Sequence, residues 1–246
     1  MTTLTARTAI VTGASRGIGA AIARRLARDG ITILVNYRTG QAEAEEVIRD
    51  IEAQGGAAMA VQGDLADPSA PASLFDAAEQ AFGGVDILVN NAAVSELGEI
   101  ADFDDARFEA QVALNLGGVF RGMREGARRL RDGGRIINLS STVVGTYQPR
   151  YGVYAATKAA VEALTHVAAK ELGSRGITVN AVSPGPIETA LFLTGKSAAQ
   201  VQSITQLIPL GRLGQPEDVS GLIAFLASPD GGWVNGQVIR ANGGVI

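Results

Sequence analysis

A glycine-rich turn near the N-terminus constrains the fold of this chain more than any other feature. The stretch Thr12–Gly19 follows the apolar run Thr8–Val11 and precedes a helical run from Ala20 to Arg28. A strand, a glycine turn and a helix in this order place backbone N–H groups and the positive end of a helix where a pyrophosphate can bind. The spacing Gly-x-x-x-Gly-x-Gly matches the usual dinucleotide pattern only loosely, and such turns are also ordinary tight connections. The turn therefore indicates a nucleotide cradle only in combination with motifs farther along the chain.

Apolar runs alternate with helical patterns along the rest of the chain. We expect further strands at residues 31–35, 57–62, 86–89, 135–139, 178–182 and 237–241. We expect helices around residues 44–51, at 69–82, 104–131 and 151–172, and near Pro216. Such alternation implies right-handed crossovers and a parallel sheet, and 246 residues with 46% hydrophobic content form one sizeable core. The prediction is a single-domain α/β protein over residues 1–246, with a Rossmann-like, doubly wound parallel sheet in three α/β/α layers.

The composition excludes several partners and chemistries. The chain has no cysteine and one histidine, His166, so we expect no disulfide, no thiolate nucleophile and no metal site. Thiol-dependent aldehyde oxidation and zinc-dependent alcohol oxidation are thereby excluded. A net charge of −4 gives no general basic surface for nucleic acid. Because the segment Met1–Arg7 lacks an apolar signal core and no run of about 18 apolar residues exists, we expect a soluble, cytoplasmic protein without a membrane partner.

The end of the second strand carries information about the cofactor. A carboxylate there would accept hydrogen bonds from the adenosine ribose 2′-hydroxyl and favour NAD, but the chain has Asn36-Tyr37-Arg38. Arg38 and Arg16, which lies in the glycine turn, can neutralise a 2′-phosphate through charge-assisted hydrogen bonds. A single arginine is more often a solvated surface charge. Two arginines and a missing acid together favour NADP(H), with NAD(H) as the alternative.

Three side chains in the second half of the chain indicate carbonyl chemistry. Tyr154 and Lys158 are four residues apart on an expected helix, so they share one face. A nearby ammonium lowers the pKa of a tyrosine from about 10 towards the range of a working acid and base. Ser141 follows a strand at the carboxyl edge of the sheet, where a hydroxyl can polarise a carbonyl oxygen. Alone, the first pair is common on solvated helix faces and the serine is typical of a turn.

These motifs together resemble the short-chain dehydrogenase/reductase family, in its classical form, over nearly the whole chain. In order, they are Thr12–Gly19, Gly63-Asp64-Leu65, Asn90-Asn91-Ala92, Asn115, Ser141, Tyr154-Ala155-Ala156-Thr157-Lys158 and Pro184-Gly185. Any one of these motifs is weakly specific, whereas all of them in this order are highly specific. The chain departs from the family pattern at Ala93, where glycine is usual, and at Asn242, where aspartate is frequent.

The resemblance implies four catalytic residues. Tyr154 is similar to the general acid of ketone reduction and base of alcohol oxidation, and Ser141 to its oxyanion partner. Lys158 resembles the residue that lowers the tyrosine pKa and holds the nicotinamide ribose, and Asn115 the residue that supports this lysine through a water-linked proton path. Tyr154 and Lys158 are also implied cofactor contacts, together with Gly13, Ser15, Arg16, Gly17, Ile18, Gly19, Asn36, Arg38, Asp64, Leu65, Asn90, Ala92, Pro184, Gly185, Ile187 and Thr189. The presence of all four catalytic types argues against the second hypothesis, a non-catalytic NADP-binding regulatory protein.

The segment at about residues 188–213 resembles the substrate lid of the family. Its apolar residues predict either an apolar pocket wall or packing of the lid onto the core: Leu191, Phe192, Leu193, Ile204, Leu207 and Ile208. We expect an NADP(H)-dependent oxidoreductase that acts on a ketone or secondary alcohol, including a 3-oxoacyl thioester. The same residues suit a sugar, polyol or steroid dehydrogenase.

A basic series lies near the end of the helix expected over residues 104–131: Arg121, Arg124, Arg128, Arg129 and Arg131. In the 3-oxoacyl-[acyl-carrier-protein] reductases that this chain resembles, basic residues near the site receive an acidic carrier protein. Runs of charge are more often a solvated face or a subunit contact, so an acyl carrier protein is the less favoured interpretation. Family resemblance also implies a homotetramer.

Overall fold

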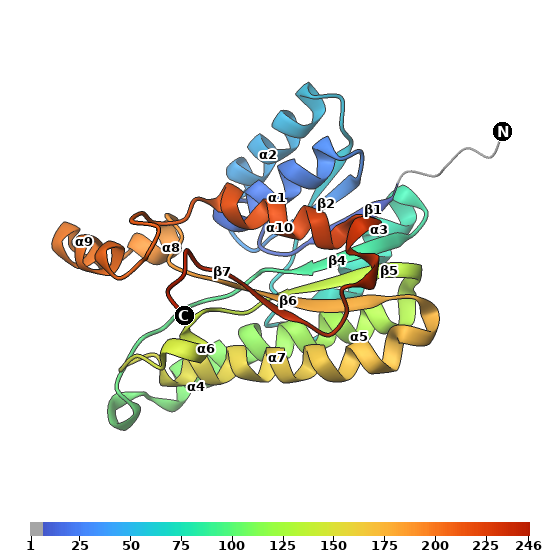
Figure 1. Ribbon diagram of the computed structural model, residues 1–246. Coiled ribbons are helices and arrows are strands. Elements are labelled where there is room, and N and C mark those ends of the chain that lie inside the picture. The colour runs from blue at the N-terminus through green and yellow to red at the C-terminus, as the bar shows by residue number, and fades with distance from the viewer. Residues whose placement is uncertain (1–6) are drawn as a thin grey trace.

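The computed structural model describes residues 7–246, which form one sheet with helices on both faces (Figure 1). Its strands are β1 (Thr8–Val11), β2 (Thr32–Tyr37), β3 (Ala58–Gln62), β4 (Val85–Asn90), β5 (Leu130–Leu139), β6 (Thr178–Pro184) and β7 (Val238–Ala241). All neighbouring strands run parallel, in the order β3-β2-β1-β4-β5-β6-β7. Because the order reverses between β1 and β4, a ligand crevice is expected outside the carboxyl ends of these two strands. The predicted doubly wound parallel sheet is confirmed, while most of the Met1–Arg7 segment lies outside the described residues.

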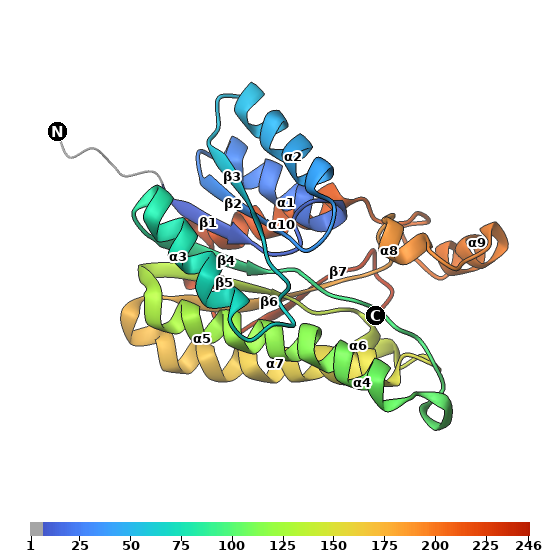
Figure 2. The same cartoon turned by 180° about the vertical axis from the view of Figure 1, so that it is seen from behind.

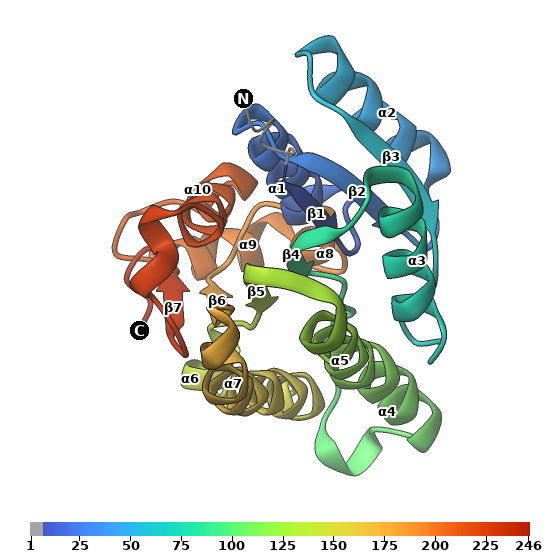
Figure 3. The same cartoon turned by 90° about the vertical axis from the view of Figure 1, so that its right-hand side faces the viewer.

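The helices form a layer on each face of the sheet. They are α1 (Gly17–Arg28), α2 (Gln41–Ala53), α3 (Ala70–Phe82), α4 (Asp105–Val112), α5 (Val119–Arg129), α6 (Val143–Thr146), α7 (Gly152–Leu172), α8 (Ala190–Leu193), α9 (Ala198–Gln206) and α10 (Pro216–Ala227), with short 3₁₀ turns at Ile100–Asp102, Gly173–Arg175 and Asp230–Trp233. Figures 2 and 3 show α1, α2 and α10 on one face and α3, α5 and α7 on the other. The short helices α6 and α8 lie beside the carboxyl edge of the sheet, and α9 projects beyond it (Figure 1).

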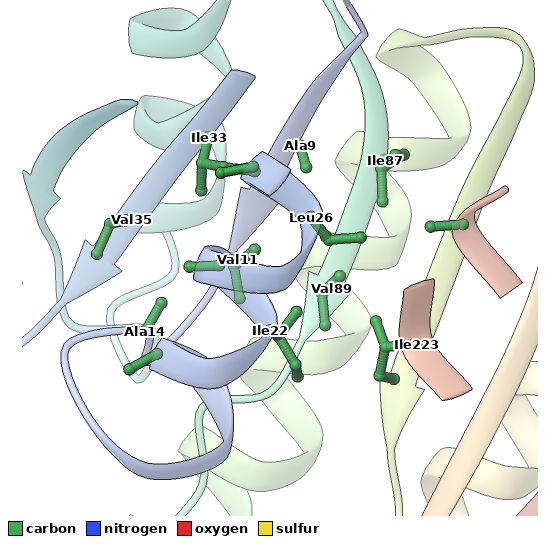
Figure 4. Packing of buried hydrophobic residues seen from close by; sticks show 14 of the residues in the cluster. Ala9, Val11, Ala14, Ile22, Leu26, Ile33, Val35, Ile87, Val89 and Ile223 are labelled. Carbon is green, nitrogen blue, oxygen red and sulfur yellow. The ribbon is translucent and has the colours of Figure 1, made fainter. Parts of the chain in front are cut away.

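Alternate residues of each central strand pack into opposite layers, which explains why these strands are apolar throughout. Val11 and Val89 face α1 and α10, where they pack with Ile22, Leu26 and Ile223 (Figure 4). The residues before them in the chain, Ile10 and Leu88, belong to the layer formed with α3, α5 and α7. The burial of both faces fixes the register of the strands and therefore the positions of the loops at their carboxyl ends.

The helix expected over residues 104–131 is wrong in two details. It is interrupted by a π-helical turn at Ala113–Gly118, and the chain enters β5 at Leu130, before the expected start at residue 135. Leu130 is buried and pairs with Val85, and the left-handed conformation of Gly133 then lets the chain bend into the main ladder. Apolar periodicity cannot separate a π turn from an α-helix, because both bury nearly the same residues.

The segment of the expected lid contains two helices, α8 and α9, which are not among the helices expected from the sequence. Thr189 and Ser197 begin them, each with a side chain that accepts a hydrogen bond from a backbone N–H of the first turn. No residue within α8 or α9 is buried. Within residues 7–246, no helix combines the length and the apolarity that crossing a membrane requires.

Candidate active site

Two polar side chains, Thr12 and Asn91, hold the glycine turn against the end of β4. The hydroxyl of Thr12 donates to Val89 O (3.3 Å) and accepts from the backbone N–H groups of Asn91 (2.9 Å) and Ala92 (3.1 Å). The Asn91 amide donates to the carbonyls of Thr12 (2.8 Å) and Gly13 (3.1 Å). The turn between β1 and α1 is thus tied to the end of β4.

Asn36 fastens the other side of the same turn. Its Oδ1 accepts from Gly13 N at 3.2 Å, its backbone carbonyl accepts from Ala14 N at 2.8 Å, and its Nδ2 donates to Gly63 O at 3.1 Å. The Asn36 side chain is fully buried. Asn36 therefore joins the turn to the loop after β3, a role that no local sequence pattern indicates.

The N-terminus of α1 presents backbone donors without a competing side chain. Arg16 occupies the N-cap position without a side-chain cap, and the first turn contains no acidic residue. Gly19 must be glycine, because a Cβ there would lie 2.6 Å from Asn91 Nδ2. Gly13 and Gly17 adopt positive φ angles of 61° and 56°. An anion can approach this helix end closely, which suits a pyrophosphate.

The first pocket, here named the loop pocket, lies over this turn and the ends of β2 and β3. Arg16 and Arg38 supply its positive charge, and no acid stands at the end of β2. Arg38 Nη1 lies 3.8 Å from an oxygen of Asp64, and both side chains are substantially exposed. The two guanidiniums outnumber the one carboxylate, that of Asp64, so the pocket keeps a net positive charge. This charge fits a 2′-phosphate and a pyrophosphate better than a ribose without a phosphate.

The second pocket, here named the tyrosine pocket, adjoins the first. Its walls include Ser141, Tyr154 and Lys158. Both pockets share the following lining residues: Ile18, Asn91, Ala93, Thr189 and Leu191. A molecule as long as a dinucleotide can therefore extend from the glycine turn to the tyrosine.

Most of the predicted cofactor contacts line these two pockets. The loop pocket contains Gly13, Ser15, Arg16, Gly17, Ile18, Gly19, Asn36, Arg38, Asp64, Leu65, Ala92 and Thr189. The tyrosine pocket contains Ile18, Tyr154, Lys158, Pro184, Gly185, Ile187 and Thr189. Asn90 lies apart from both linings, because its amide is buried against β5 and donates to Asn138 Oδ1 at 2.8 Å. Its neighbour Asn91 lines both pockets instead.

Tyr154, Lys158 and Ser141 meet where α7 faces the end of β5. The Tyr154 ring lies with its centroid 5.8 Å from Lys158 Nζ, and Ser141 hydrogen-bonds to the Tyr154 hydroxyl. Lys158 is 2% exposed, and its Nζ donates to Leu139 O at 2.7 Å. An ammonium has three donors, so two remain for other partners. The predicted tyrosine, lysine and serine are therefore brought together by two neighbouring elements.

Asn115 lies in the π-helical turn, fully buried behind this group. Its side chain accepts from Val94 N at 2.9 Å and donates to Val94 O at 2.8 Å. Its Nδ2 also lies 3.4 Å from the hydroxyl of Thr157, the residue before Lys158. π-Helical turns inside α-helices occur frequently at functional sites. Here the turn places Asn115 between the loop after β4 and α7, and no hydrogen bond recorded for this side chain reaches Lys158.

Burial dominates the ionisation of the tyrosine and the lysine. It raises the pKa of Tyr154 to about 12, and the hydrogen bond from Ser141 offsets only part of this increase. It lowers the pKa of Lys158 to about 8. The expected lowering of the tyrosine pKa is therefore wrong for the protein by itself, because desolvation outweighs the lowering that Ser141 causes. Near neutral pH the phenol carries its proton and the lysine is mostly charged.

Sequence reasoning missed several residues of the tyrosine pocket. Tyr151 lies one helical turn before Tyr154, with its ring centroid 6.5 Å from that of Tyr154 in an edge-to-face arrangement. Its spacing of three residues on the same helix could have indicated this position. Ser95 and Val245 also line the pocket, but they come from a loop and from the C-terminal end, where no periodic signal exists.

The basic series, which spans α5 and the start of β5, is mostly engaged in internal ion pairs. Arg129 pairs with Asp76 and Glu79 at 2.7 Å, and Arg131 with Asp86 at 3.0 Å. Internal ion pairs, rather than the solvated face or subunit contact considered from the sequence, therefore account for these two arginines. His166 is exposed, and its Nδ1 lies 2.8 Å from Gly236 O.

Comparisons with known proteins agree with this geometry. Residues 13–246 match the family model described as enoyl-(acyl carrier protein) reductase. The chain is 46% identical to a short-chain type dehydrogenase/reductase of Picea abies, over 98% of this chain and 92% of the relative. It is 45% identical to NADPH-dependent aldehyde reductase 2, chloroplastic, of Arabidopsis thaliana, over 99% and 95% of the two chains. A short chain dehydrogenase from Burkholderia cenocepacia J2315, solved in complex with NADP, is 38% identical over 97% of each chain with a TM-score of 0.92.

Proposed function

Because the chain belongs to the short-chain dehydrogenase/reductase family, we propose that it is an NADP(H)-dependent oxidoreductase of carbonyl compounds and secondary alcohols. The observation that carries this proposal is the meeting of Tyr154, Ser141 and Lys158 in a pocket that adjoins the glycine turn. This arrangement lets one bound molecule connect a phosphate site with a proton donor.

The loop pocket supports NADP(H) as the cofactor. The free N–H groups at the start of α1 would hold the pyrophosphate, and Arg16 and Arg38 would neutralise the 2′-phosphate. The bound cofactor supplies a hydride to the substrate. Relatives whose names specify NADPH or whose structures contain NADP support the same choice.

The residues around the carbonyl oxygen would control its proton. Tyr154 is protonated near neutral pH, so its hydroxyl donates a hydrogen bond and then the proton to the oxygen. The Ser141 hydroxyl stabilises the charge that develops on that oxygen. The ammonium of Lys158 stabilises the tyrosine anion left behind, and Asn115 keeps the loop after β4 in place behind it. Oxidation of an alcohol would use the same groups in reverse.

The lining of the tyrosine pocket favours a carbonyl compound with an apolar body. Leu191, Phe192 and Ile204 from the lid segment, together with Val143, form much of its wall. An aldehyde or ketone fits this lining, and a 3-oxoacyl thioester fits it as one member of the class. A sugar or polyol fits less well, because these apolar side chains would face several hydroxyl groups.

The assembly and location are further proposals. Exposed aromatic side chains on α4 and α5, Phe108 and Phe120, and the 98% exposed Trp233 support contacts between copies. A homotetramer would cover these side chains, and its mass in solution would test this. The cytoplasm remains the proposed location.

Absorbance assays of NADPH and NADH with aldehydes, cyclic ketones, diketones and 3-oxoacyl thioesters would test the function. We expect oxidation of NADPH with at least one class, faster than oxidation of NADH. If the protein bound NADPH but oxidised it with no member of the panel, a regulatory nucleotide-binding protein would be the better explanation.

A further inference from the structure

The strand that leads to Ser141 presents alternate residues to α7. Ile136 packs in the apolar layer with Val161 of α7, and Asn138 Nδ2 donates to Thr165 Oγ1 at 2.9 Å. Ser140 continues this row, and its hydroxyl donates to Glu162 Oε1 at 2.5 Å. The end of β5 therefore becomes polar towards α7 where it approaches the reacting residues.

The contact between Ser140 and Glu162 lies beside the catalytic group. Glu162 is one helical turn after Lys158 on α7, and Lys158 already donates to Leu139 O at 2.7 Å. Two consecutive residues at the end of β5 are thus attached to two consecutive turns of α7. Ser141 follows them directly in the chain.

The Ser140 side chain is well placed to transmit this attachment. Ser140 is 4% exposed, and its backbone N–H donates to Val182 O of β6 at 2.7 Å. Its backbone is therefore fixed from one side by β6 and its hydroxyl from the other by Glu162. A hydroxyl bound to a carboxylate forms a charge-assisted hydrogen bond, about twice as strong as one between neutral groups.

We propose that Glu162 is a positioning residue for the reaction: through Ser140 it fixes the distance between Ser141 and the Tyr154 hydroxyl. This role rests on the proposed reductase function, because it matters only where both hydroxyls contact the same carbonyl oxygen. A displacement of Ser141 weakens stabilisation of the transition state while leaving the loop pocket unchanged.

Variants at both ends of the contact separate positioning from simple stabilisation. Glu162→Leu and Ser140→Ala remove the acceptor and the donor, and we expect each to lower kcat about tenfold. Glu162→Gln keeps an acceptor oxygen and should restore most of the lost kcat. The double variant Glu162→Leu with Ser140→Ala should be no slower than the slower single variant, because both remove one contact.

Binding and stability measurements complete the experiment. The affinity for NADPH, from fluorescence titration, should change little in Ser140→Ala and Glu162→Gln, and the melting temperature should fall by no more than about 5 °C. Glu171 is exposed near the end of the same helix, so Glu171→Leu is the matched control and should keep the wild-type kcat.

Three outcomes would overturn the positioning role. The first is wild-type kcat in both Ser140→Ala and Glu162→Leu. The second is a kcat that falls only in proportion to lost NADPH affinity or melting temperature, which would indicate stabilisation alone. The third is a wild-type protein that binds NADPH yet reduces no carbonyl compound, which would overturn the proposed function and this role with it.

Discussion

The glycine turn and the lid segment border the same two pockets, but they are held in different ways. The turn is fixed by hydrogen bonds that involve the side chains of Thr12, Asn36 and Asn91, which lie at or directly after the ends of three different strands. The lid is anchored at its far end, where Ile208 and Leu213 are buried, whereas nothing in α8 or α9 is. The comparison indicates that cofactor binding depends on the rigidly held glycine turn, whereas substrate choice depends on the loosely packed lid.

The largest effect is expected from a substitution that distorts the glycine turn. Gly19→Ala places a Cβ 2.6 Å from Asn91 Nδ2 and against the carbonyl of Gly13. Since the hydrogen bond between these two atoms holds the turn in place, we expect NADPH affinity to fall by more than about a hundredfold. Fluorescence titration measures this loss. Gly173→Ala is the control, because Gly173 has a helical φ of −58° and no neighbour within 4 Å of an added Cβ.

A smaller effect is expected when one positive charge is removed from the loop pocket. Arg38→Ser removes one guanidinium from the loop pocket and should raise the KM for NADPH about tenfold, with little change for NADH. Arg49 is exposed on α2, so Arg49→Ser should leave both KM values unchanged. An equal increase for both cofactors would contradict the assignment of Arg38 to the 2′-phosphate.

The reaction at Tyr154 and Lys158, which lie between the glycine turn and the lid, should depend on pH. Burial lowers the pKa of Lys158 to about 8, so the ammonium is present below this pH and lost as pH rises through it. Tyr154, with its pKa raised to about 12, keeps its proton over the same range. We therefore expect the kcat of carbonyl reduction to fall about tenfold between pH 7 and pH 9. A rate that increases over this interval would show that the ammonium is not needed.

The smallest effect is expected from the lid. Leu191 is 55% exposed and lines both pockets, so Leu191→Ala removes only part of an apolar contact. We expect the substrate KM to rise about threefold and NADPH affinity to change less than that. Leu207 is 66% exposed and is absent from the linings of both pockets, and Leu207→Ala should change neither. If Leu191→Ala lost more NADPH affinity than it raised the substrate KM, the distinction between the glycine turn and the lid would be wrong.

The sequence predicted the parallel sheet correctly and placed Tyr154 and Lys158 on one helix, because each of these features depends on a local pattern. Apolar strands and glycine turns follow from period and composition, and Tyr154 with Lys158 follows from helical spacing. The lid helices were missed because they bury no residue and therefore show no apolar periodicity. The π turn at Asn115 was missed because its effect is a change in backbone hydrogen bonding.

Contacts between distant residues were the other gap. Asn36 was expected to touch the cofactor, and its side chain also binds Gly13 and Gly63. Glu162 gave no signal, because a glutamate on a helix is ordinary until the fold brings Ser140 within hydrogen-bonding distance. The direction of the tyrosine pKa was misjudged for a similar reason, since burial is a property of the whole fold.

The central claim is that the Tyr154 hydroxyl supplies the proton to a carbonyl oxygen beside the bound nicotinamide. The most direct test compares Tyr154→Phe with Tyr147→Phe, which removes the hydroxyl of a 73% exposed tyrosine outside the linings of the two pockets. Each variant is measured for NADPH binding and for turnover of the best substrate from the panel. The account predicts that Tyr154→Phe binds NADPH like the wild type and loses at least about a thousandfold in kcat, while Tyr147→Phe keeps both properties. Turnover by Tyr154→Phe at the wild-type rate would contradict it.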